Sequence, residues 1–240
     1  MTLPPPVQFT FHAVNFYPLY LGLALALLWL PRQWLRFGVI RASRRRPRDW
    51  APNRDRQPGD VSVRFGEEFR KARNWVDFFR ALAGSVAVGG LLPGVAAFAA
   101  ADPRPTKDNL HFILLLKAVV MLVSLLVQLL RVEGRVTLFA PLFFLQGLSF
   151  GFLGVPAAVL AVVGVWALNP ALPSAAVFLF VLGALELVFS SLFGVSRLSM
   201  AMVVALTMMP GFVSILSKRH LAQFTKKTKI ISTSSSSARD

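Results

Sequence analysis

The chain has 240 residues, of which 55% are hydrophobic, and it carries a formal net charge of +15. Its mean hydropathy of +0.60 indicates one membrane-embedded domain with small polar attachments rather than several soluble domains. The sequence contains no cysteine, which excludes disulfides, thiolate metal sites and cysteine nucleophiles. Abundant Arg, Ala, Leu and Val without Cys is typical of a GC-rich bacterial gene.

Six long apolar runs predict the fold class. A helix needs about 20 apolar residues to cross a hydrocarbon core of about 30 Å, whereas strands usually span about 3–10 residues and the segments of membrane barrels alternate in polarity. We therefore expect an all-α, polytopic helical membrane protein with five to seven transmembrane helices. The runs cover residues 16–30, 75–101, 110–130, 136–168, 174–194 and 198–217.

Charge placement predicts the orientation. Fourteen Lys or Arg residues and six acidic ones lie between Arg32 and Arg80, directly after the first run. A cleaved signal peptide has its positive charge before the apolar core, so the first run is expected to be an uncleaved anchor with the N-terminus outside. The expected parts are an outer segment 1–15, an anchor 16–31, a basic cytoplasmic loop 32–74, a helical bundle 75–217 and a basic, Ser-rich, disordered tail 218–240. The expected location is the bacterial inner membrane.

Basic clusters of this kind flank the apolar runs. This placement favours contact with the lipid bilayer and its anionic head groups over binding of nucleic acid. The residues expected to contact head groups are Arg41, Arg44, Arg45, Arg46, Arg70, Lys71 and Arg73.

An amphipathic segment closes the basic loop. Its apolar residues recur at spacings of four and three, which predicts one face of a helix. Two interpretations are open: the helix lies in the membrane interface, or its apolar face packs on the cytoplasmic side of the protein. The face consists of Phe65, Phe69, Ala72, Val76, Phe79 and Ala83.

The run at 136–168 is too long for one simple span, because a continuous helix of this length would extend about 50 Å. A break is expected at Gly147, Gly151, Gly154 and Pro156. The run then forms one kinked crossing, a re-entrant hairpin or two short crossings. A single crossing would return the basic C-terminal tail to the outside, so the charge rule favours the hairpin or the two short crossings.

Two charged residues, Lys117 and Glu186, lie deep within apolar runs. In the hairpin topology both lie about 12 Å from the outer membrane surface, so they are expected to pair. A structural ion pair is the favoured interpretation. The alternatives are a Lys117 side chain that extends to the interface, and a proton or ion relay in which Glu186 titrates.

No phosphate-binding loop, nucleophile elbow or paired-ligand spacing occurs. We therefore predict no catalytic residue, metal site or cofactor, and the chain is not expected to be an enzyme. The favoured function is a scaffold or subunit of a membrane complex, with another membrane protein or a second copy of the chain as partner. The alternative is a small transporter or channel-like protein that uses Glu186 and Lys117.

Overall fold

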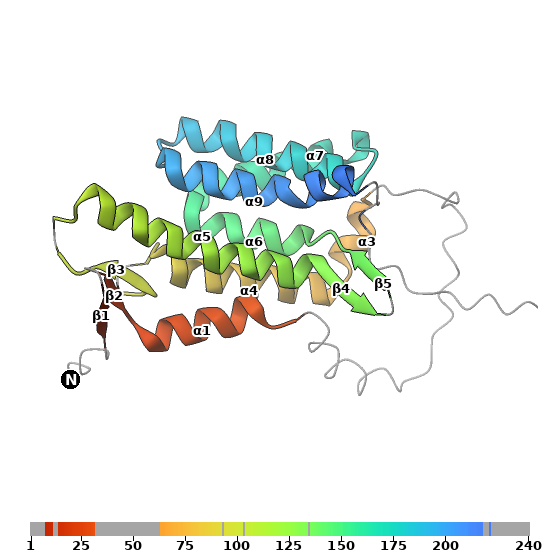
Figure 1. Ribbon diagram of the computed structural model, residues 1–240. Coiled ribbons are helices and arrows are strands. Elements are labelled where there is room, and N and C mark those ends of the chain that lie inside the picture. The colour runs from red at the N-terminus through yellow and green to blue at the C-terminus, as the bar shows by residue number, and fades with distance from the viewer. Residues whose placement is uncertain are drawn as a thin grey trace, which may run out of the picture.

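The computed structural model describes residues 8–11, 14–31, 63–92, 94–102, 104–133, 135–217 and 221. Long helices lie side by side along one axis and alternate in direction (Figure 1). They are α1 (Pro18–Trp29), α4 (Ala72–Gly89), α5 (Lys107–Leu129), α6 (Leu142–Leu153), α7 (Val155–Leu168), α8 (Ala175–Leu192) and α9 (Arg197–Leu216). A short helix, α3 (Phe65–Phe69), precedes α4, and a 3-10 helix, η1 (Asn169–Ala171), follows α7.

One end of the bundle, which we term the basic end, holds Leu30 and Val63, which lie close in sequence to either side of the Arg-rich segment. The Gln128 side chain, at the end of α5, donates a hydrogen bond to the Leu30 carbonyl at 3.1 Å. The Asn169 side chain, after α7, donates one to the Val63 carbonyl at 2.8 Å. The last residues of α1, α5 and α7 therefore lie together at this end, and α9 also ends there (Figure 1).

The opposite end carries a small antiparallel sheet with the strand order β1 (Phe9–Phe11), β2 (Val14–Phe16), β3 (Phe98–Ala100). A second pair of strands, β4 (Leu130–Glu133) and β5 (Arg135–Leu138), forms a hairpin after α5. The molecule is thus mostly helical, as expected, with these short strands at the ends of the helices. They lie where the chain leaves an apolar helix and its backbone groups need new hydrogen-bond partners.

The run at 136–168 contains two helices that fold back on one another. The chain reverses at Gly154, whose backbone angles (φ 77°, ψ 163°) belong to a region that is essentially restricted to glycine. Near the other ends of the two helices, the Trp166 indole donates to Gln146 Oε1 at 3.1 Å, and the rings of Phe143 and Trp166 lie 5.7 Å apart. Helices α6 and α7 therefore form an antiparallel hairpin with arms of about 18 and 21 Å.

The amphipathic segment is not one continuous helix, which corrects the sequence-based expectation. It divides into α3 and α4, and the two parts face different surroundings. Phe69 of α3 packs against Trp166 at 4.8 Å and Phe143 at 5.3 Å between ring centroids. Val76 and Phe79 of α4 point outward, with 47% and 57% of their surface exposed. The first part therefore packs on the protein, as the second interpretation proposed.

Helix α4 has its polar face inside the bundle. Asn74, Asp77 and Ser85 are buried, while the apolar stripe with Val76 and Phe79 is exposed. In water this arrangement would be unfavourable, since apolar surface is the part that gains from burial. In lipid the apolar face needs no protein cover, and the polar groups need partners inside the protein.

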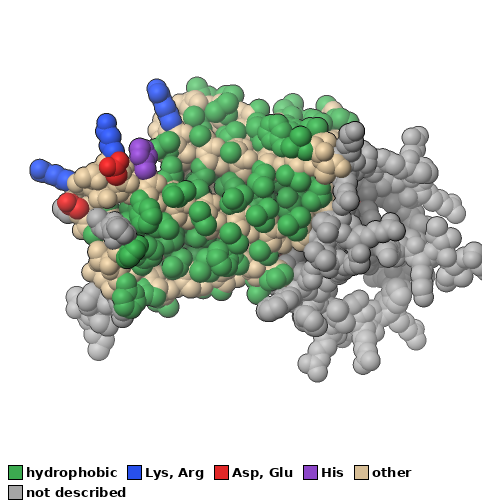
Figure 2. All heavy atoms as spheres, in the orientation of Figure 1, with side chains coloured by type: hydrophobic (Ala, Val, Ile, Leu, Met, Phe, Trp, Pro, Cys, Tyr) green, Lys and Arg blue, Asp and Glu red, His purple; other side chains and the backbone are tan. Residues whose placement is uncertain are grey.

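The surface agrees with this arrangement. In Figure 2 hydrophobic side chains cover the middle of the bundle, and the Lys, Arg, Asp, Glu and His side chains that are visible gather at the end with the small sheet. Helices α5, α8 and α9 are each long and apolar enough to cross a membrane, and α1, α6 and α7 are apolar but shorter. These three long helices indicate a membrane location.

Candidate functional site

Glu186 is the candidate site residue that lies deepest in the protein, because none of its surface is exposed. It lies on the inner face of α8, which packs against α6, α7 and α9. Its Oε1 is in hydrogen-bonding contact with the hydroxyl group of Ser149 on α6, and Thr207 of α9 lies within reach of the carboxyl group. Oε2 has no hydrogen-bond partner among the described residues.

Ser190 extends this polar group along α8. It follows Glu186 by one helical turn, so the two side chains lie on the same face of the helix. Ser190 is also fully buried, and within the described part of the chain its Oγ has no hydrogen-bond partner. A carboxyl group and three hydroxyl groups from three helices thus form a polar centre within an apolar bundle.

Lys117 has a different role from the one that the sequence predicted. Its ammonium group donates a hydrogen bond at 2.9 Å to the carbonyl oxygen of Gly89, the last residue of α4. The carbonyl groups at the end of a helix lack partners within the helix, and the helix dipole makes this end favourable for a cation. Lys117 therefore caps the C-terminus of α4.

The expected pair of Lys117 and Glu186 is not formed, and this part of the prediction is corrected. Lys117 on α5 contacts α4, whereas Glu186 on α8 contacts α6. The prediction compared only the depths of the two residues along the membrane normal. Which side of a helix carries a residue, and which helices are neighbours, depends on the packing of the bundle.

The residues expected at the helix break divide into two groups. Gly154 and Pro156 are at the reversal itself, where α6 ends and α7 begins. Gly147 and Gly151 lie within α6, where they allow close approach to α4. A Cβ atom at Gly147 would collide with the Phe78 carbonyl, and one at Gly151 would collide with the Ser85 backbone. The two inner glycines therefore serve helix packing rather than the turn.

The expected head-group residues are only partly described. Arg41, Arg44, Arg45 and Arg46 lie outside the described residues. Arg70 is exposed and Arg73 is partly exposed, while Lys71 forms an ion pair with Glu68. Each of these three lies between α3 and α4 or in the first turn of α4.

A buried cluster at the basic end was missed by the sequence analysis. Arg80 and Asp77 of α4 form an ion pair at 3.0 Å with only 5% and 4% of their side-chain surface exposed. Arg80 also donates to Gln128 Oε1 at 2.6 Å and to the Leu30 carbonyl at 2.5 Å. The available signal was an acidic and a basic residue three positions apart at the start of an apolar run, which places them together on a helix face.

This cluster also holds the end of α1. The Gln128 side chain donates to the carbonyl groups of both Leu28 and Leu30, at 3.3 and 3.1 Å. Together with Arg80, it supplies partners for carbonyl groups that α1 leaves unpaired at its C-terminus. The polar interior of the described bundle thus has a structural cluster at the basic end and the Glu186 centre within α6, α8 and α9.

No protein family, curated protein or solved structure matches this chain.

Proposed function

We propose that the chain is a multi-pass integral membrane protein that acts as a scaffold or subunit of a membrane complex. In this proposal α1, α4, α5, α8 and α9 cross the membrane, and α6 and α7 form a re-entrant hairpin from the cytoplasmic side. The N-terminus lies outside and the basic end lies in the cytoplasm of a bacterial cell. The charge rule supports a hairpin or two short crossings over a single crossing, because the basic C-terminal tail then lies in the cytoplasm. The arm lengths of about 18 and 21 Å do not separate a re-entrant hairpin from two short crossings, because α1 is also only about 18 Å long.

The close packing of α6 is the observation that best supports the proposed scaffold function. Ten of its residues are buried, from Leu142 to Leu153, and it contacts α4, α7, α8 and α9. Gly147 and Gly151 bring its backbone directly against α4. A helix in this central position fills the space along the bundle axis, where a transport path would run. This packing supports a rigid structural body with an outer apolar surface that binds lipid or other membrane helices.

Native mass spectrometry tests this proposal. The full chain, tagged after Asp240, is extracted from the membranes of its native host into lipid nanodiscs. We expect a complex of fixed stoichiometry with another membrane protein or with a second copy of the chain. Glu186→Gln serves as a matched control and should leave this complex unchanged, because residue 186 is buried within the protomer. A monomer that carries only lipid would contradict the proposed function.

A small proton transporter is the second candidate, and the buried carboxyl group of Glu186 beside a broken helix favours it. Broken helices near the middle of the membrane are a common feature of transporters, and ionisable groups there often carry protons. Proteoliposomes with an imposed pH gradient and an enclosed pH-sensitive dye test this candidate. Proton flux in the wild type that is lost in Glu186→Gln would support it, and equal rates with empty liposomes would exclude it.

A further inference from the structure

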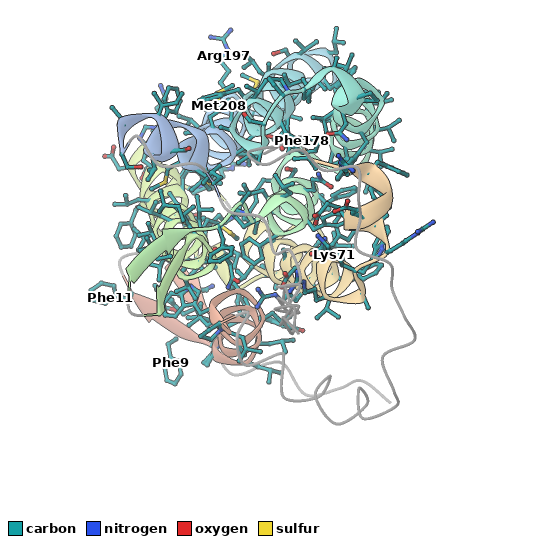
Figure 3. The ribbon with its side chains drawn as sticks, turned by 90° about the vertical axis from the view of Figure 1, so that its right-hand side faces the viewer. Phe9, Phe11, Lys71, Phe178, Arg197 and Met208 are labelled. Atoms are coloured by element: carbon teal, nitrogen blue, oxygen red, sulfur yellow. The ribbon has the colours of Figure 1, made fainter. Side chains whose placement is uncertain are left out.

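Among the residues that the structure describes, the polar centre around Glu186 contains no cation that could neutralise a carboxylate. Helices α6 and α7 contain no charged residue, and the only one in α9 is Arg197. Arg197 lies ten residues before Thr207, about 15 Å along the helix axis, and its side chain extends away from the bundle (Figure 3). Lys117 on α5 is bonded to Gly89, and Arg80 on α4 is paired with Asp77.

Burial without a cation makes an ionised Glu186 very unfavourable. The free energy of transferring a lone carboxylate into an apolar interior is so high that the group takes up a proton instead. In water or in a surface cleft, solvent would stabilise the charge. Glu186 has no exposed surface, and the hydroxyl groups near it supply only neutral dipoles.

The number of hydrogen atoms available for the contacts of Ser149 also indicates that Glu186 is protonated. The Ser149 Oγ lies 3.1 Å from the Leu145 carbonyl oxygen, one turn earlier in α6, and it also contacts Glu186 Oε1. A serine hydroxyl has one hydrogen to donate. If that hydrogen goes to Leu145, the contact with Glu186 requires a hydrogen from the carboxyl group. A protonated Glu186 satisfies both contacts of Ser149, whereas with an ionised Glu186 the single Ser149 hydrogen serves only one of them.

We propose that Glu186 is a proton-binding site: in the folded protein its carboxyl group holds a proton and donates a hydrogen bond to Ser149 Oγ, which joins α8 to α6. The proposed ligand is a proton rather than an alkali cation, because a Ser149 hydroxyl that donates to Leu145 can only accept a hydrogen from the carboxyl group. Ser149 in turn donates to Leu145, so the three groups form one directed chain. This inference holds whether the protein is a scaffold or a transporter.

Infrared spectroscopy of the full chain in lipid nanodiscs at pH 7 tests the protonation state directly. A protonated carboxyl group has a carbonyl stretching band that is separate from those of carboxylates and amides. Asp77 and Glu68 form ion pairs with Arg80 and Lys71, whereas Glu186 has no cationic partner among the described residues. We expect one protonated-carboxyl band in the wild type, its loss in Glu186→Gln, and a shift of its frequency in Ser149→Ala.

Four results would overturn the proposal. They are the absence of the band in the wild type, its persistence in Glu186→Gln, an unshifted band in Ser149→Ala, and its loss when choline chloride is replaced by sodium chloride. The last result would identify an alkali-cation site. The wild-type and Ser149→Ala spectra decide the question even if Glu186→Gln does not fold.

The pH dependence of unfolding provides a second test. The unfolded chain releases this proton above the ordinary glutamic acid pKa of about 4.3, so the folded state holds one proton more than the unfolded state. Stability must then fall as the pH rises, by up to a factor of ten per pH unit in the unfolding equilibrium constant. We expect Glu186→Gln to lack this contribution between pH 6 and 8. Identical pH profiles for the two proteins would contradict the proposal.

Discussion

At the scale of single residues, two cationic side chains inside the described bundle each have a clear partner. Arg80 is neutralised by Asp77, and Lys117 caps the carbonyl end of α4. Both arrangements follow from the high free energy of a charge or an unpaired backbone group in lipid. Glu186 differs because the polar groups that it contacts in the described part of the chain are neutral hydroxyls, and for this reason it is the residue most informative to titrate.

Arg80→Ala should strongly destabilise the protein. It removes Arg80 from its buried ion pair with Asp77, and breaking a buried ion pair in this way typically lowers the free energy of unfolding by about 3–5 kcal/mol. Thermal unfolding in a mild detergent measures the effect. The matched control is Arg70→Ala, since Arg70 is exposed and surface substitutions usually change stability by less than about 0.5 kcal/mol.

A double variant separates the charge from the packing. Asp77→Asn combined with Arg80→Gln removes both charges together, so it should be less destabilising than Arg80→Gln alone. If the double variant is as unstable as the sum of the two single variants, the ion pair does not couple the two residues, and the role assigned to the cluster is wrong.

At the scale of the elements, the α6–α7 hairpin depends on two different uses of glycine. Gly154 allows the chain to reverse, because its backbone angles are essentially closed to other residues. Gly147 and Gly151 allow the α6 backbone to approach α4, as small residues generally do between helices in lipid. The sequence showed three glycines in a cluster but could not assign these separate functions to them.

Gly154→Ala should destabilise the hairpin by about 1–3 kcal/mol, the usual range for a residue held in such a strained conformation. The matched control is Gly22→Ala in α1, where an added Cβ atom meets nothing within 4 Å and alanine favours the helix. Thermal unfolding in detergent compares the two variants. Equal stability of Gly154→Ala and the control would show that the reversal does not require glycine.

At the scale of the whole molecule, the arrangement of the helices predicts the exposure of each end to water. The natural chain lacks cysteine, so single cysteines introduced at chosen positions can be labelled with a membrane-impermeant maleimide. On intact cells we expect Ser196→Cys, between α8 and α9, to react from outside. Ser217→Cys, at the basic end, should react only after the membrane is opened.

The hairpin tip distinguishes a re-entrant loop from two short crossings. Val155 lies at this tip with 55% of its surface exposed in the isolated protein. If the hairpin ends within the membrane, Val155→Cys should remain unlabelled from outside, while Ser196→Cys, its control, is labelled. Labelling of both positions at equal rates would instead indicate that α6 and α7 cross the membrane.

The sequence predicted much of the element pattern but little of the polar interior. The apolar runs that contain α5, α8 and α9 were evident because a helix that faces lipid must be apolar over most of its length. The contact between Arg80 and Gln128 was not recognised, because the two residues are 48 positions apart and meet only in the folded bundle. Their buried contacts depend on distances across the bundle, which have no regular spacing in the sequence.

The sequence by itself determined the helical class, the apolar runs and the break at 136–168, since these follow from the composition and spacing of neighbouring residues. Only the tertiary structure decided that α6 and α7 fold back on one another, that Lys117 caps α4 and that Glu186 contacts Ser149. The reason is geometric. The position of a residue along its helix determines its depth in the membrane, but the rotation of each helix and the arrangement of neighbouring helices determine which side chains meet at that depth.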